Sequence, residues 1–204
     1  MIGGTNLATA ARAVLCEADA PEKAARTLCL VAAWRAGNLP AGEQHIAMPE
    51  RPARPARPEL LPPRDMPRRR TGGTAGRIAL LHAVTHIELN AIDLAWDLIG
   101  RFGAEDWPGE FYADWLGVAE DEARHFNLLQ GRLNDLGACY GDLPAHDGLW
   151  QAAMATAHDP LARLAVVPMV LEARGLDVTP NMIARLRRAG DNSSADILEV
   201  IYQE

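Results

Sequence analysis

Apolar residues recur three and four positions apart from Arg77 to the end of the chain, the spacing that places side chains on one face of an α-helix. No segment shows a sustained alternation of apolar and polar residues or a β-branched run, so the sequence predicts no sheet. The predicted fold class is all-α, and four long helices with connectors predict a bundle. The long helices are expected at residues 76–102, 108–137, 159–175 and 193–204, and shorter helical segments at 149–158 and 179–191.

Proline, glycine and hydroxyl residues mark the expected helix ends. Pro108 and Pro180 suit the first turn of a helix, and Thr179 is the expected N-cap before Pro180. Gly137 and Gly190 are placed to follow the last turn of a helix. The final segment opens with a pair of serines, and we expect a serine N-cap there.

An N-terminal helical extension and a proline-rich strap precede the bundle. Residues 5–38 predict two helices, the second with Pro21 in its first turn. Residues 48–76 carry repeated prolines, which exclude regular helix, so we expect a linker or a strap lying across another surface. The predicted domains are the extension at residues 1–47, the strap at 48–76 and the bundle at 77–204.

Charge and cysteine content argue against several classes of protein. The formal net charge of −7 disfavours general binding to nucleic acid or to an anionic membrane. Cys16, Cys29 and Cys139 are widely spaced and match neither a disulfide framework nor a thiolate zinc motif. Without a secretory leader or a run of about 18 apolar residues, the chain is expected to be soluble, cytoplasmic and free of membrane spans.

The second long helix carries two polar residues inside its apolar face. Glu122 and His125 share that face with apolar residues on both sides, whereas Glu120, Asp121 and Arg124 fall on other faces, as solvated charges do. A carboxylate moved into a dry core costs several kcal/mol unless it is paired or bound to a metal ion. The apolar members of this face are Trp115, Val118, Leu129, Leu133 and Leu136.

Two other long helices repeat this pattern with one glutamate each. Glu88 lies among apolar residues at helical spacing in the first long helix, and Glu172 does so in the third. Pro168 precedes Glu172 by four residues and can kink the helix, which would open space for a ligand or produce a harmless bend. Three helices are therefore predicted to direct one glutamate each toward the core.

A divalent metal ion would account for these inward carboxylates. Glutamates and a histidine from facing helices suit iron or manganese, and Glu-x-x-His places both donors on one helix face. A di-iron bundle uses one glutamate on each of two helices and a Glu-x-x-His on each of the other two. Glu88, Glu122, His125 and Glu172 fill four of those six positions. The alternative is a buried polar network in an all-α protein.

Linked motifs along most of the chain carry a family resemblance: "HIELNAIDLAWD", "EDEARHFNLLQGRLNDLG", "LPAHDGLW", "VLEARGLDVTP" and the strap "RPARPELLPPRDMPRRR". They resemble the bacterial ferritin-like proteins of the domain-of-unknown-function 455 family. The resemblance implies a ferritin-like four-helix bundle with a carboxylate-bridged metal pair. It implies two iron ions, with manganese as the alternative metal, held by Glu88, Glu122, His125 and Glu172.

The chain departs from the family pattern at its end. That pattern continues into a second Glu-x-x-His, whose glutamate would directly follow Glu204, so we expect the last helix to be truncated there. Glu204 itself is an alternative ligand. Ile197 and Val200 precede Glu204 at helical spacing, whereas Leu198 and Ile201 equally support the next position, and the register stays open.

Other polar and aromatic residues have simpler interpretations. His82, His86 and Asn90 lie on a different face of the first long helix, so we interpret them as supporting, interhelical or surface groups rather than ligands. His146 and His158 are expected in turns or caps, with a place in a substrate pocket as the alternative. The tryptophans expected to serve core or interface packing are Trp96, Trp107, Trp115 and Trp150.

The strap is rich in arginine. The simplest interpretation is a solvated linker that pairs with the acidic surface of the bundle, and the alternative is a phosphate-binding edge for RNA or an anionic substrate. Because tRNA-modifying hydroxylases also use ferritin-like di-iron bundles, the alternative rests on analogy of fold and site. These arginines are Arg51, Arg54, Arg57, Arg64, Arg68, Arg69 and Arg70.

The sequence thus predicts an oxidoreductase in which two iron ions, or iron and manganese, activate dioxygen to oxidise an unidentified organic substrate with an unknown reductant. Glu88 and Glu172 are expected as terminal or bridging ligands, Glu122 as a bridging ligand and His125 as a nitrogen donor. A metal-storage or peroxide-scavenging protein, a tRNA-hydroxylase-like enzyme and a non-catalytic interaction protein are the alternatives. A homodimer is compatible with the sequence.

Overall fold

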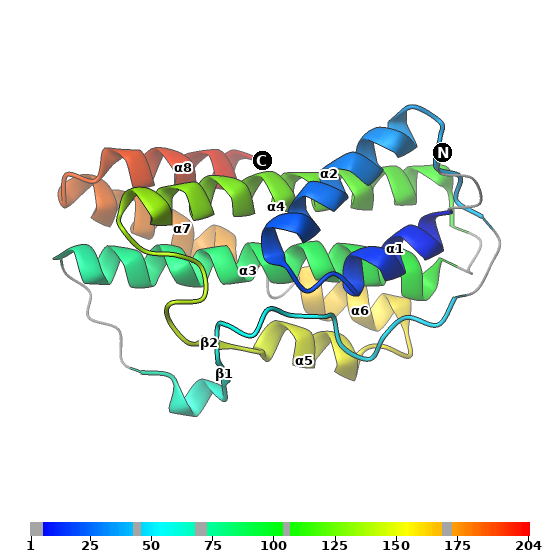
Figure 1. Cartoon of the computed structure of the whole chain (residues 1–204), viewed down its shortest axis with the longest axis horizontal. Helices are drawn as coiled ribbons and strands as arrows, with labels where there is room; N and C mark the ends of the chain where they lie inside the picture. The colour runs from blue at the N-terminus through cyan, green and yellow to red at the C-terminus, as the bar shows by residue number, and fades with distance from the viewer. Residues whose placement is uncertain (1–5, 43–45, 68–72, 104–106, 169–172) are drawn as a thin grey trace. The chain divides into compact units, whose positions relative to one another are not determined.

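A computed structural model describes residues 6–42, 46–67, 73–103, 107–168 and 173–204 of the chain. Most of the described residues are helical, so the prediction of an all-α fold is confirmed (Figure 1). The helices are α1 (Leu7–Leu15), α2 (Ala20–Arg35), α3 (Gly73–Phe102), α4 (Gly109–Asp135), α5 (Gly148–Ala155), α6 (Pro160–Val166), α7 (Ala173–Arg188) and α8 (Asn192–Gln203). The remaining elements are the two-residue strands β1 (Leu60–Leu61) and β2 (Ala145–His146) and the 3-10 turn η1 (Pro63–Asp65).

The chain forms two compact units, and both long helices contribute to each. Unit 1 comprises Met1–Pro55 and Glu88–Arg124, and unit 2 comprises Ala56–Ile87 and His125–Glu204. The three-part division into extension, strap and bundle stays a prediction.

Side chains at the N-terminal ends of α1 and α2 determine where these helices of unit 1 begin. The Asn6 side chain accepts a hydrogen bond from the backbone N–H of Thr9 at 2.9 Å, and Asp19 accepts one from Glu22 at 3.0 Å. Each bond satisfies an N–H that the first helical turn leaves without a backbone partner. Gly37 follows α2 with a φ of 71°, a backbone conformation that favours glycine.

Unit 1 has an apolar core and a buried ion pair that holds the strap. The ammonium of Lys23 lies 2.5 Å from Asp93 Oδ1 and also donates to the carbonyl of Ala53 in the strap. Arg54 reaches Asp93 and Asn90 from the same strap segment. Burial lowers the pKa of Lys23, and the carboxylate of Asp93 offsets this only in part. The first half of the strap is therefore anchored to helices α2 and α3 of its own unit.

Close helix packing in unit 1 depends on a glycine of α3. A Cβ atom added at Gly100 would lie 2.8 Å from the Cβ of Ala11 in α1 and 2.5 Å from the sulfur of Met48. Because real Cβ atoms are not found at such distances, the position accepts only glycine without local movement. Trp96, fully buried in the same helix, donates its indole N–H to Thr27 of α2 at 3.1 Å.

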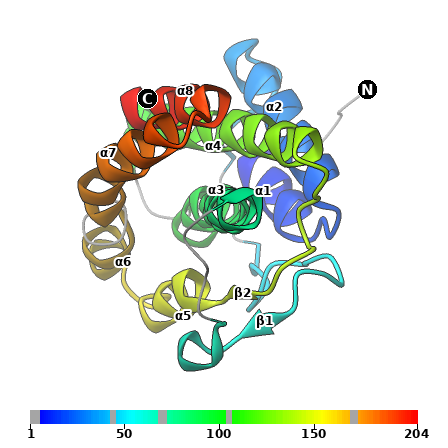
Figure 2. The same ribbon diagram turned by 90° about the vertical axis from the view of Figure 1, so that its left-hand side faces the viewer.

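The core of unit 2 is built from α3, α4, α7 and α8. Helices α7 and α8 lie side by side in this unit (Figure 2). Leu81 of α3, Leu129 and Leu133 of α4 and Leu198 of α8 are buried to 1% exposure or less in one cluster. Burying each such side chain contributes roughly 1.5–3 kcal/mol.

The prediction of no sheet is wrong for one short contact in unit 2. Strands β1 and β2 pair in parallel, with Leu60 opposite Ala145 and Leu61 opposite His146. The backbone N–H of Ala145 also donates to the carbonyl of Glu59 at 2.9 Å. Two-residue strands carry no detectable alternation, so the sequence pattern had no signal for them. This pairing fixes the second half of the strap to the loop that follows α4.

Helix α7 does not begin where the sequence predicts. It runs from Ala173 through Pro180, and the hydroxyl of Thr179 donates to the carbonyl of Gly175 at 2.8 Å. A hydroxyl that bonds to the carbonyl four residues earlier belongs to a helix interior, so the N-cap assigned to Thr179 is wrong. Gly190 follows the helix with a φ of 75°, as expected.

The N-cap of α8 is also different from the predicted serine. Asp191 caps the helix, accepting hydrogen bonds from the backbone N–H of Ser194 at 3.1 Å and from its hydroxyl at 2.9 Å. Arg132 of α4 donates to the same carboxylate at 2.9 Å. Burial alone would raise the pKa of Asp191, but the hydrogen bonds from Ser194 and Arg132 outweigh it and hold the pKa below its ordinary value.

The predicted third long helix is described only in part. Its N-terminal end is α6, where Asp159 accepts hydrogen bonds from the backbone N–H groups of Leu161 and Ala162. The positions at 169–172 lie outside the described residues.

Helix α3 is long and apolar enough to cross a membrane by length and composition alone. Its most apolar window has a mean hydropathy of 1.2, and 72% of that window is buried inside the protein. A buried core helix passes the same test, so this is weak evidence for a membrane span.

Candidate metal centre

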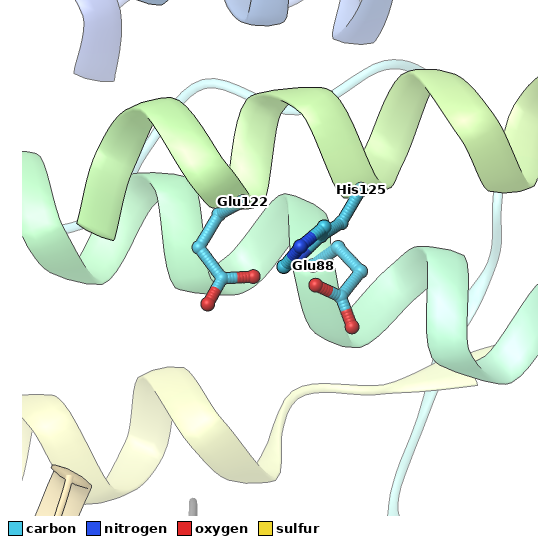
Figure 3. A group of neighbouring side chains, drawn as sticks. All are labelled: Glu88, Glu122 and His125. Carbon is cyan, nitrogen blue, oxygen red and sulfur yellow. The ribbon is translucent and has the colours of Figure 1, made fainter. Parts of the chain in front are cut away.

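Three side chains from two helices meet at one point (Figure 3). Glu88 comes from α3, and Glu122 and His125 come from successive turns of α4. One ligand atom from each lies within 4.8 Å of the other two. The structure therefore brings together three of the four residues that the sequence nominates as metal ligands.

Glu88 lies in the apolar face of α3, as its spacing predicts. It is 5% exposed, and the residues one and two turns along the same face, Ile92 and Ala95, are almost fully buried. A side chain at this position is removed from bulk water, which makes an uncompensated negative charge costly.

Glu122 and His125 lie where the face of α4 changes from partly to fully buried. Trp115 and Glu122 are half-buried, whereas His125 is 4% exposed and Leu129 is fully buried. The helix thus carries its two candidate ligands at the boundary between a solvent-accessible turn and the core.

The neighbouring charges of α4 turn away from this group. Glu120 forms an ion pair with Arg35 of α2, with oxygen–nitrogen distances of 2.7 and 2.5 Å. Arg124 pairs with Asp121, and both side chains are more than one third exposed. These ion pairs agree with the prediction that Glu120, Asp121 and Arg124 lie on other faces of the helix than His125.

Glu204 contacts the candidate ligand His125. Its Oε2 atom lies 2.8 Å from Nε2 of His125, and its side chain is 32% exposed. Leu198 is buried whereas Val200 is 40% exposed, so the apolar face of α8 follows the register that excludes Glu204. The carboxylate of Glu204 nevertheless reaches the histidine.

Glu172, the fourth nominated ligand, lies outside the described residues. Its role stays a prediction.

The two histidines of α3 contact the loop that follows α4. His82 accepts a hydrogen bond from the backbone N–H of Gly141 at 3.0 Å. His86 contacts the hydroxyl of Tyr140 at 2.8 Å and the carbonyl of His146 at 3.1 Å. Both side chains are at most 5% exposed. These contacts agree with the interpretation of both histidines as supporting residues. The contact with Tyr140 was not predicted, because a residue in a loop belongs to no periodic pattern.

The other polar residues singled out in the sequence are two histidines, Asn90 and the strap arginines. His146 lies in β2, where its Nδ1 accepts a hydrogen bond from the backbone N–H of Gly148 at 3.2 Å, and His158 is exposed. Asn90 accepts a hydrogen bond from Arg54 at 2.6 Å, so this strap arginine is anchored rather than free for phosphate. Of the other strap arginines, those exposed in the described part are Arg51, Arg57 and Arg64, and Arg68, Arg69 and Arg70 lie outside it.

The donor set fits a first-row transition metal. Two carboxylates and one imidazole are ligands that iron and manganese accept. A cation placed among Glu88, Glu122 and His125 would offset the cost of holding two negative charges at a largely buried point. Nothing in this group resembles a thiolate zinc site, since every donor is oxygen or nitrogen.

Comparisons with known proteins identify relatives without an assigned activity. The model of the family described as "Protein of unknown function (DUF455)" matches residues 16–204. A protein of Haemophilus influenzae described as uncharacterized is 46% identical over 155 residues, which cover 74% of this chain and 54% of that protein. The chain therefore spans about half the length of this relative. No solved structure matches the chain.

Proposed function

The chain belongs to the family described as protein of unknown function DUF455, and we propose that it is a non-haem iron or manganese oxidoreductase that activates dioxygen. The observation that carries this proposal is the convergence of Glu88, Glu122 and His125 within 4.8 Å. The ferritin-like di-iron architecture implied by the resemblance is part of the proposal.

Each residue of the group has a distinct role in the proposed centre. Glu88 would supply a terminal or bridging carboxylate, Glu122 a bridging carboxylate and His125 an imidazole nitrogen. Glu204 would accept a hydrogen bond from Nε2 of His125, which leaves Nδ1 of that ring as the donor to the metal. Bound iron or manganese would supply one-electron redox chemistry and the activation of dioxygen.

A second metal ion requires further donors. Bundles that hold a metal pair use about six protein ligands, of which the described residues supply Glu88, Glu122 and His125. Glu172 remains the proposed ligand from the third helix, and Glu204 is a further carboxylate beside His125. The organic substrate and the reductant stay unidentified, and RNA binding, a homodimer and a cytoplasmic location stay predictions.

Metal analysis of paired variants tests the proposal. The protein is purified without added metal, reconstituted with Fe(II) or Mn(II) under anaerobic conditions, desalted and analysed by mass spectrometry for bound metal. We expect stoichiometric uptake by the wild type and by Glu120→Gln, whose carboxylate pairs with Arg35 on the outer face. Glu122→Gln should lose most of the bound metal.

Two results would overturn the proposed function. One is a wild-type protein that retains no iron or manganese after reconstitution. The other is a Glu122→Gln variant that retains as much as Glu120→Gln. If metal binds but the Fe(II) protein consumes no dioxygen beyond a buffer control, metal storage replaces oxidation as the function.

A further inference from the structure

His82 connects α3 of unit 2 to the loop that follows α4. The backbone N–H of Gly141 in that loop donates to Nε2 of His82 at 3.0 Å, and the imidazole is 1% exposed. A ring nitrogen that accepts a hydrogen bond carries no hydrogen, so the neutral ring holds its hydrogen on Nδ1. The imidazolium carries a hydrogen on both nitrogens. This contact therefore exists only while His82 is neutral.

The strap packs on the loop at the same glycine. Gly141 has a φ of 106°, and a Cβ atom added there would lie 3.2 Å from the Cβ of Arg57 in the strap, closer than an ordinary contact. Three residues further along the strap, β1 begins at Leu60 and pairs with β2. The hydrogen bond to His82 thus holds in place the part of the loop that receives the strap.

Several titratable and charged groups belong to the elements packed around His82. Tyr140 of the loop stacks on its ring at a centroid distance of 5.4 Å, and Phe126 of α4 meets Tyr140 edge-on at 5.7 Å. The other groups are His86 on the next turn of α3, Asp142 in the loop, His146 in β2 and Arg57 in the strap. Of these residue types, histidine is the one that gains a charge between about pH 8 and 5.

We propose that His82 is a pH-operated latch for the second half of the strap. When Nε2 takes up a proton, the imidazolium and the N–H of Gly141 become two donors facing each other at a buried position. Burying a charged ring in this way is far more costly than the loss of the few hydrogen bonds that a two-residue strand pairing supplies. The loop therefore moves away from α3 in acid, and its contacts with the strap open.

Amide hydrogen exchange of the purified full chain, followed by nuclear magnetic resonance, tests the latch at the bond itself. An opening that takes up one proton becomes about tenfold more favourable for each unit by which the pH falls. We expect the protection factor of the Gly141 amide to fall by this amount per unit below about pH 6.5. The amide of Ala145, which donates to the carbonyl of Glu59 in the strap, should follow it.

The same spectra contain an internal control. The amide of Ala10 in α1 donates to the carbonyl of Asn6 at 2.9 Å, and its protection factor should stay constant over this pH range. A protection factor at Gly141 that is as constant as that of Ala10 would overturn the proposal.

Three substitutions separate His82 from the neighbouring histidines. His82→Gln can accept the N–H of Gly141 through its side-chain oxygen but takes up no proton, so protection at Gly141 should no longer depend on pH. His86→Gln and His146→Gln should leave that dependence intact. A dependence that persists in His82→Gln would contradict the latch.

Nitrogen chemical shifts of the His82 ring in the wild type give a check that needs no substitution. Nε2 should gain its proton over the same pH range in which the Gly141 amide opens. A ring that stays neutral while the amide opens would also overturn the proposal. Since none of these measurements requires a metal ion, their outcome is separate from that of the proposed function.

Discussion

The carboxylate of Glu204 lies 2.8 Å from Nε2 of His125, although the two residues are 79 positions apart in the sequence. His125 is 4% exposed and Glu204 stands at the C-cap of α8. The contact brings a negative charge from the last described residue to a histidine that the proposed function uses as a ligand. A partner of this kind fixes the orientation of a ligating imidazole and raises its basicity.

Glu204→Gln keeps the length of the side chain and removes its charge. We expect the affinity for Fe(II) to fall by about 10–100-fold, the usual effect of losing the group that orients a ligand. Anaerobic titration with Fe(II) against a competing chelator measures the affinity. Glu199→Gln is the control, since this carboxylate of α8 is 41% exposed and contacts Arg187 instead. Equal affinities for Fe(II) in the two variants would show that Glu204 does not support the metal site.

The periodicity of long helices was enough to find the group itself. Glu88, Glu122 and His125 sit on apolar faces of α3 and α4, and a helix of many turns repeats its buried face so often that polar exceptions are visible in the sequence. The same argument left Glu204 open, because Ile197 and Val200 support one register of the last helix whereas Leu198 and Ile201 support the next.

Contacts between distant segments could not be predicted. Lys23 and Asp93 are 70 positions apart, and each alone resembles an ordinary surface charge in a helix. The hydroxyl of Tyr140 reaches His86 from a loop, where no periodic pattern exists. Asp191 caps α8 in place of a serine, and Arg132 of another helix donates to the same carboxylate, a distant contact that the local sequence does not reveal.

The buried ion pair of unit 1 should make Asp93 important for stability. Asp93→Asn leaves the ammonium of Lys23, 1% exposed, without its closest counter-charge. Breaking a buried pair in this way costs about 3–5 kcal/mol of unfolding free energy. Urea unfolding followed by circular dichroism measures the loss. Glu17→Gln breaks the exposed pair with Arg26 and should cost less than about 1 kcal/mol.

The same variant should respond to pH in a defined direction. A lysine whose folded pKa lies below 10.5 binds fewer protons in the folded state, so stability rises with pH between the folded pKa and 10.5. Without Asp93 the pKa of Lys23 falls further, and the rise begins at a lower pH. The stability difference between wild type and Asp93→Asn should therefore be largest near neutral pH and shrink as the pH increases. A difference that grows with pH would refute this account.

The course of α7 leads to a prediction at Pro180. The structure places this proline inside the helix, where it removes a backbone hydrogen bond, whereas a proline in the first turn of a helix would be favourable. Pro180→Ala should therefore stabilise the protein by about 1–3 kcal/mol in urea unfolding. Pro160→Ala is the matched control, because Pro160 opens α6 directly after the Asp159 cap and its replacement should be neutral or slightly destabilising. If both substitutions behaved like that control, α7 would begin at Pro180, and Thr179 would regain its role as the N-cap.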